Sequence, residues 1–265
     1  MKKILALSAI AALLLGGLTS CAKAPDPANA YLDESPQEIY AKGLTALHKR
    51  SYNEAIKRFE ALEVQYPYGE ETGNAELGLI YAYYQREDYT LATAMADHYI
   101  HMHPVGPDLD YAYYMRGISN YYQNLGILER WFSLDLAKRD LVQIETSYSD
   151  FNEVVTHFPE SEYAPAAHQY MIYLRNILAD HEAHIAEYYY ERGAYVAAAD
   201  RASDLVAHFQ GAPTVQDGLI IMAKSYHALG LNQQANDAMR VLQLNYPDTP
   251  SDIDALRVHL DTKTT

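Results

Sequence analysis

Cysteine is nearly absent from this chain, which has one, Cys21, among 265 residues. A disulfide needs two thiols, so no bridge within the chain can stabilise it. The folded domain must therefore be held together by packing alone. The 49% of residues that are hydrophobic are sufficient for a sizeable core.

Long hydrophobic runs are also missing, apart from a short one at the N-terminus. Lys2 and Lys3 precede residues 4–18, which are apolar or small but too few to cross a bilayer, a pattern typical of an export signal. The signal ends in Leu18-Thr19-Ser20-Cys21, which resembles the bacterial lipobox, where the cysteine is acylated and becomes the first mature residue. We predict a signal peptide at 1–20 and a lipid anchor on Cys21; the alternative is an ordinary secreted protein with an incidental cysteine.

Basic residues are scarce, with 20 lysines and arginines against 35 aspartates and glutamates. Removal of residues 1–20 takes away two lysines and no acid, which leaves a formal charge of −17. So acidic a surface disfavours nucleic acid and electrostatic docking on anionic lipid. Membrane attachment is therefore expected through the acyl chains alone, each buried CH₂ contributing about 0.8 kcal/mol.

The segment after the anchor has the composition of a linker. Residues 21–35 contain Pro25 and Pro27 and show no apolar period, which predicts a flexible tether. Fully extended at roughly 3.4 Å per residue, it would reach about 50 Å from the membrane. Ala22, rather than aspartate, follows the cysteine, and in many Gram-negative bacteria this permits transport to the outer membrane.

Catalytic motifs are absent: the sequence has no phosphate-binding G-x-x-x-x-G-K-[ST] and no G-x-S-x-G elbow. His181-Glu182-Ala183-His184 is one residue short of H-E-x-x-H, and His98, His101 and His103 fall in a last helical turn before Pro104. We interpret both histidine groups as structural or surface residues. We predict no metal, no cofactor and no enzymatic activity, and keep a histidine-dependent hydrolase as the weakest alternative.

What is abundant is a recurring helix stop. Prolines directly after an aromatic residue or histidine recur at Pro67, Pro104, Pro159 and Pro247, and Pro213 is a variant four residues after Phe209; the spacings are 37, 55, 54 and 34 residues. Because proline ends a helix, and because the tetratricopeptide period is 34 residues, the pattern predicts paired helices. In the first repeat Gly43 lies on the first helix, Ala55 on the second, and Phe59 follows four residues later.

We therefore predict an all-α tetratricopeptide-repeat superhelix of about five helical hairpins and a C-terminal capping helix at about 250–261. Repeats 1–3 occupy an N-terminal half, 36–159, with an insertion near residues 126–140. Repeats 4 and 5 and the capping helix occupy a C-terminal half, 160–262, whose first helix is long, roughly 162–192. Such arrays are usually binding scaffolds, although a fold alone does not establish a function.

Tyrosine is the compositional outlier, with 25 copies against five phenylalanines. Neighbouring tyrosines on a helix lie about 100° apart, so they cannot all face the core. We predict a substrate groove lined by several of them, while packing between repeats is the alternative for each: Tyr66, Tyr68, Tyr81, Tyr83, Tyr84 and Tyr113.

Several longer segments are more specific than the repeat signature. PQEIYAKG, RSYNEAIKRFEALEVQYPYGE, LIYAYYQREDY, DYAYYMRG and AEYYYERGAYVAAADR follow one another in order after the lipobox. From the signal to about residue 247, the chain resembles the BamD (ComL) family of outer-membrane assembly lipoproteins. The insertion matches the interrupted third repeat of that family.

The resemblance implies a non-enzymatic scaffold at the periplasmic face of the outer membrane, within the machinery that inserts β-barrel proteins. The C-terminal repeats would hold the last POTRA domain of BamA, with Arg201, Arg192 and Glu191 as the family's partner-binding positions. The N-terminal repeats would receive unfolded outer-membrane proteins, and the lipoproteins BamC and BamE would dock along the flank. The alternative function is that of another tetratricopeptide lipoprotein, a cell-envelope organiser that works with peptidoglycan-related partners.

Overall fold

The structure is a computed structural model that describes residues 26–125, 136–138, 140–258 and 260. Every α-helix in these residues belongs to one of five antiparallel hairpins, and no residue among them forms a strand. The predicted signal peptide, Cys21 and most of the insertion near residues 126–140 lie outside the described residues. None of the described helices is both long enough and apolar enough to cross a bilayer.

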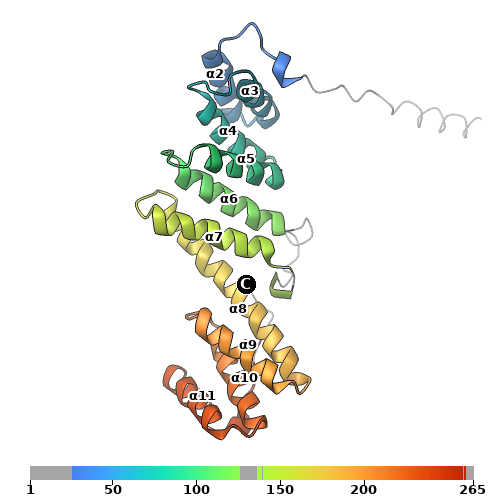
Figure 1. Ribbon diagram of the computed structural model, residues 1–265, viewed down its shortest axis with the longest axis vertical. Coiled ribbons are helices and arrows are strands. Elements are labelled where there is room, and N and C mark those ends of the chain that lie inside the picture. Colours follow the sequence, from blue (N-terminus) through green and yellow to red (C-terminus); the bar gives the residue numbers. More distant parts are fainter. Residues whose placement is uncertain (1–25, 126–135, 139, 259, 261–265) are drawn as a thin grey trace, which may run out of the picture.

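The five hairpins stack in chain order into an elongated superhelix (Figure 1). We call the first helix of each hairpin A and the second B. The pairs are α2 (Pro36–His48) with α3 (Tyr52–Gln65), α4 (Thr72–Gln85) with α5 (Tyr89–Met102), α6 (Leu109–Asn124) with α7 (Val142–His157), α8 (Ala164–Glu191) with α9 (Tyr195–His208), and α10 (Val215–Ala228) with α11 (Asn232–Asn245). The predicted fold class and hairpin number are confirmed.

Local signals place the helix ends. At the start of α2, the backbone N–H of Ser35 donates to Glu38 Oε2 at 2.9 Å, and the N–H of Glu38 donates to Ser35 Oγ at 3.3 Å, which completes a capping box before Pro36. Four B helices, α3, α5, α7 and α11, end two residues before a proline, as the stop pattern predicts. The long A helix expected at 162–192 is α8.

Large apolar side chains of B helices are wedged against small residues of A helices. The ring of Phe59, fully buried on α3, lies between Gly43 of α2 and Gly78 of α4. Phe151 of α7 occupies the same place beside Gly117 of α6. Leu205 of α9 lies against Gly218 of α10. Each wedge fixes how closely successive A helices approach.

A buried ion pair reinforces the third hairpin. Asp150 of α7 is 2% exposed and accepts hydrogen bonds from Arg116 Nε at 3.0 Å, Arg116 Nη2 at 2.6 Å and Asn120 Nδ2 at 3.0 Å. Burial raises the pKa of Asp150, against the opposing effect of Arg116. Because three donors satisfy this carboxylate, its burial does not leave an unpaired charge.

Two segments differ from the prediction. Residues 26–35, expected to be part of a flexible tether, instead pack against α3: Gln65 Nε2 donates to the carbonyl oxygens of Pro27 and Ala30, and Arg58 lies 4.2 Å from the ring centroid of Tyr31. The described residues of the predicted capping helix at about 250–261 do not form an α-helix. They contain one 3-10 turn, Ile253–Ala255, and Leu256 after it has extended backbone.

This C-terminal segment nevertheless covers the last repeats. Leu256 is fully buried, and Lys224 Nζ of α10 donates to its carbonyl oxygen at 3.2 Å. Val258 and Leu260 pack against alanine-rich clusters on α8 and α9. Buried contacts with extended backbone replace the predicted helix.

The wedge at Phe59 leads to a stability prediction. A Cβ at position 78 would lie 2.6 Å from the Phe59 ring, so Gly78→Ala forces the fully buried ring to move. We expect a loss of about 1–3 kcal/mol, measured as a lower thermal midpoint by circular dichroism.

Gly73→Ala, on the same helix, is the matched control. Its Cβ would lie 3.6 Å from the nearest neighbour, the His103 ring, which is ordinary van der Waals contact. The control should be neutral or stabilising by up to about 1 kcal/mol. Equal effects of the two substitutions would contradict the wedge.

Candidate partner-binding surfaces

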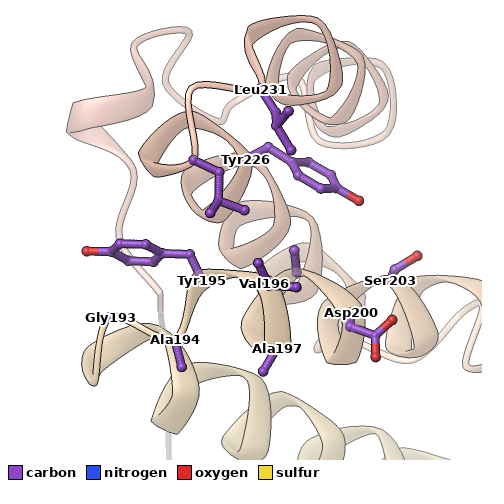
Figure 2. A pocket seen from close by; sticks show the side chains of 11 residues that line it. Gly193, Ala194, Tyr195, Val196, Ala197, Asp200, Ser203, Tyr226 and Leu231 are labelled. Atoms are coloured by element: carbon purple, nitrogen blue, oxygen red, sulfur yellow. The ribbon is translucent and has the colours of Figure 1, made fainter.

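A large pocket lies in the C-terminal repeats, between α9 and the turn from α10 to α11. Its volume is ≈ 890 Å³. Figure 2 shows Tyr226 and Leu231 across from Val196, Asp200 and Ser203 of α9. The rest of the lining comes from Gly193, Ala194, Tyr195, Ala197, Ala199 and Leu229.

The lining of this pocket is apolar and accessible. Val196 is 70% exposed, and Leu229 and Leu231 are 37% and 41% exposed. Gly193, which has a φ of +73°, lets the chain turn tightly from α8 into α9 and leaves the pocket mouth without a side chain. A concave apolar surface with the carboxylate of Asp200 and the hydroxyl of Ser203 suits a protein partner that brings an apolar anchor and hydrogen-bond donors.

Two of the three predicted partner-binding residues are next to this pocket in the chain. Glu191 and Arg192 are exposed and immediately precede Gly193. The Arg192 guanidinium lies 4.3 Å from the ring centroid of Tyr188, which fixes its direction without using its hydrogen-bond donors.

The third residue, Arg201, lies on a different flank of α9. Asp200 and Ser203 line the pocket, whereas Arg201 Nη1 donates to Glu182 Oε2 of α8 at 3.2 Å. Its side chain is 44% exposed, so the remaining guanidinium donors face solvent. This pair is with α8 and not with Asp200 or Asp204 of the same helix.

Two residues of the His181-Glu182-Ala183-His184 segment contact neighbouring elements. His181 Nδ1 lies within hydrogen-bond distance of the carbonyl oxygen of Ala137, in the 3-10 turn Leu136–Lys138 within the insertion. Glu182 pairs with Arg201. These contacts tie α8 to its neighbours.

The six tyrosines predicted to line one groove are separated. Tyr66 and Tyr68 precede α4, at 36% and 94% exposure, whereas Tyr81 lies near the C-terminal end of α4, at 38%. Tyr81 borders a smaller pocket of ≈ 420 Å³ with Tyr52, Leu44, Leu47, His48 and Arg50. These three are the accessible members of the set.

The other three tyrosines have internal partners. Tyr83 is 7% exposed, and its hydroxyl donates to Glu60 Oε1 at 2.6 Å. Tyr84 packs at a ring-centroid distance of 5.9 Å from Tyr122 of α6. Tyr113, partly buried, lies beneath the Arg116 guanidinium. For Tyr83 and Tyr84 the alternative interpretation, packing between repeats, describes their positions.

Tyr84 and Tyr122 belong to a larger aromatic network that joins three A helices. Tyr121 of α6 lies 5.8 Å from Tyr170 and 5.9 Å from Tyr173, both on α8. Tyr170 stacks at 4.8 Å on Phe151. Much of the unusual tyrosine content therefore holds successive repeats together.

Burial in this network shifts the ionisation of the phenols. Burial is the largest cause in each case. It raises the pKa of Tyr99, which lies in the same hydrophobic core but packs on His103, to about 12. It also raises the pKa values of Tyr84, Tyr121 and Tyr170, with further upward contributions from neighbouring tyrosines. These phenols are neutral over the physiological range.

Sequence reasoning missed the C-terminal pocket. Its two walls belong to different repeats, and a valine such as Val196 is not unusual on an exposed helix face. The only signal was the pair of leucines, Leu229 and Leu231, that flank Gly230 in the α10–α11 turn.

Comparison with known proteins gives a consistent family. The model of the family YfiO, described as outer membrane lipoprotein, matches residues 32–242. Proteins named outer membrane protein assembly factor BamD are similar over most of their length. The one from Haemophilus influenzae is 34% identical, covering 93% of this chain and 92% of the relative. Those from Neisseria meningitidis and Vibrio cholerae are 34% and 30% identical, covering 94% and 88% of this chain and 93% and 95% of the relatives.

The aromatic network predicts how the protein unfolds in alkali. Tyrosines of the unfolded chain ionise near pH 10, whereas folding raises the pKa values of the buried ones. Their contribution to the stability of the folded state is therefore complete below pH 10 and is lost as the pH rises above it. We expect tyrosinate absorbance to rise in two stages, the later one coinciding with loss of helical circular dichroism. A single titration near pH 10 with the helices intact would contradict the burial of this network.

Proposed function

The chain belongs to the outer membrane lipoprotein family that includes the assembly factor BamD, and from this premise we propose that it is a non-enzymatic scaffold of the outer-membrane β-barrel assembly machinery. It is held at the periplasmic face of the outer membrane by acyl chains on Cys21. Its C-terminal repeats bind a POTRA domain of BamA, and its N-terminal repeats receive unfolded outer-membrane proteins. BamC and BamE are the further lipoprotein partners in this proposal.

The observation that carries the proposal is the accessible apolar pocket of the C-terminal repeats, whose lining residue Gly193 directly follows the exposed residues Glu191 and Arg192 in the chain. A solvent-exposed valine and two exposed leucines around a concavity provide the centre of an interface, and the charged residues provide its rim. The stacked hairpins present this surface on rigid elements.

Arg201 extends the surface along the other flank of α9. Its guanidinium uses one donor toward Glu182, so a partner carboxylate can be bound by the remaining donors without breaking that contact. In a protein with 35 acidic residues and 20 basic ones, an exposed arginine is a specific point of attachment for an acidic partner.

The attachment can be tested by pull-down of BamA from detergent extracts. Arg201→Glu removes the cation and places a second carboxylate beside Glu182, and loss of an interfacial charge pair costs about 2–5 kcal/mol. We expect binding to weaken by about 30-fold or more. Arg240→Glu, on α11 and paired with Asp237 of its own helix, is the matched control and should bind normally.

The same pull-down tests the pocket with Val196→Asp, where a charge would be buried on docking. Val105→Asp, at a valine that is 95% exposed in the N-terminal half, is its control. Circular dichroism should stay helical for all four variants. Unchanged BamA recovery with both Arg201→Glu and Val196→Asp, or recovery of cell-wall enzymes alone by the unaltered protein, would contradict the proposal.

Substrate reception is assigned to the exposed tyrosines of the N-terminal half. Titration with a peptide from the C-terminal strand of an outer-membrane barrel should give binding that Tyr68→Ala and Tyr81→Ala each weaken. Loss of a stacked aromatic contact is worth about 0.5–1.5 kcal/mol, a two- to twelve-fold change. Tyr188→Ala, at 51% exposure in the C-terminal half, should have no effect; weakening by Tyr188→Ala alone would place reception elsewhere.

A further inference from the structure

Three helices of the first two repeats bring two carboxylates and an imidazole together. Glu63 lies on α3, Glu76 on α4 and His98 on α5, and one ligand atom from each lies within 4.8 Å of the others. His98 Nε2 is 3.8 Å from Glu63 Oε1 and 3.7 Å from Glu76 Oε1. We propose that these residues bind a divalent transition-metal ion, with zinc as the best fit.

The spacing suits such an ion. Zinc binds imidazole nitrogen and carboxylate oxygen at about 2.0–2.2 Å, so ligand atoms in a tetrahedral site lie roughly 3.3–3.6 Å apart. The two measured separations exceed this range by only a few tenths of an ångström. Three protein ligands leave the fourth tetrahedral position for water, as in zinc sites that have three protein ligands.

Glu76 is held in place as metal ligands usually are. It is 4% exposed, and its second oxygen, Oε2, lies 2.8 Å from His103 Nε2. The His103 ring is itself packed 4.5 Å from the ring of Tyr99. An outer histidine that binds the free oxygen of a ligating carboxylate orients it and leaves Oε1 directed toward His98.

The cluster also has a negative charge that a cation would neutralise. Within the described chain, the ion pairs of Glu63 and Glu76 are all with His98 or His103. Carboxylate oxygen and imidazole nitrogen are ligand types that zinc binds in proteins.

A metal here would join the first repeat to the second, because α3 belongs to one hairpin and α4 and α5 belong to the next. Its binding would add to the stability of this junction by mass action. The site is remote in the chain from the C-terminal pocket, so the inference does not rest on the proposed function.

The test uses the protein purified in detergent, stripped with a chelator and titrated with Zn²⁺ alone against a chromophoric competitor. We expect one high-affinity ion per chain and a higher melting temperature when it is bound. His98→Ala and Glu63→Gln should each remove a ligand and weaken this site by about 100-fold or more. His101→Ala is the matched control, because His101 lies on the same helix but contacts Asp97 instead of the cluster.

Co²⁺ gives a second measurement that does not depend on stability. Bound Co²⁺ should show the visible absorption of a low-coordinate site, which His98→Ala abolishes and His101→Ala retains. His98 is 44% exposed, so its replacement should leave the helical circular dichroism unchanged. Absence of a stoichiometric ion, or an ion whose affinity and spectrum survive His98→Ala, would overturn the proposal.

Discussion

The contact on which the rest of the stack depends is the wedge of a large apolar side chain between the A helices of successive hairpins. Phe59 separates Gly43 from Gly78 and leaves no room for a Cβ at either. In the third hairpin Phe151 lies against Gly117 and stacks on Tyr170 of the next A helix. Leu205 does the same against Gly218. Each wedge touches two repeats at once. It therefore sets both the packing inside one hairpin and the rotation between that hairpin and the next one, and this links the repeats into one rigid body.

That constraint determines where binding surfaces can form. Side chains between successive repeats are used for packing. Tyr83, Tyr84 and the Tyr121 network are examples, since their hydroxyls or rings contact residues of a neighbouring repeat. The accessible surfaces described above lie near helix ends. Tyr68 is in the α3–α4 connection, Tyr81 is near the end of α4, and the large pocket adjoins the α8–α9 and α10–α11 turns. Rigid helices position these ends, while the turns can vary without disturbing the wedges.

The sequence predicted well whatever depends on local chemistry. Proline after an aromatic residue ends a helix wherever it occurs, and Ser35 with Glu38 forms a capping box from residues three apart, so the hairpins and most of their ends could be derived. It predicted poorly what depends on distant partners. Residues 26–35 looked like a tether because their own composition has no apolar period, yet Gln65 and Arg58 bind them from α3. The packing of Tyr84 between repeats could not be derived for the same reason, since its neighbour Tyr122 is on α6.

The C-terminal segment shows why local propensity can lose to long-range burial. Thr249-Pro250 followed by Ile253, Leu256 and Leu260 has the spacing of a short helix, but one turn of 3-10 helix is all that forms. A helix would place only one stripe against the repeats, whereas here Leu256 packs against α10 and Leu260 packs against the alanine-rich surface of α8. Lys224 satisfies the carbonyl of Leu256 that a helix would otherwise have paired. The small residues of α8 contact both this segment and Leu205. Their size therefore allows α9 to pack closely on α8 and also allows the C-terminal segment to cover the last repeats.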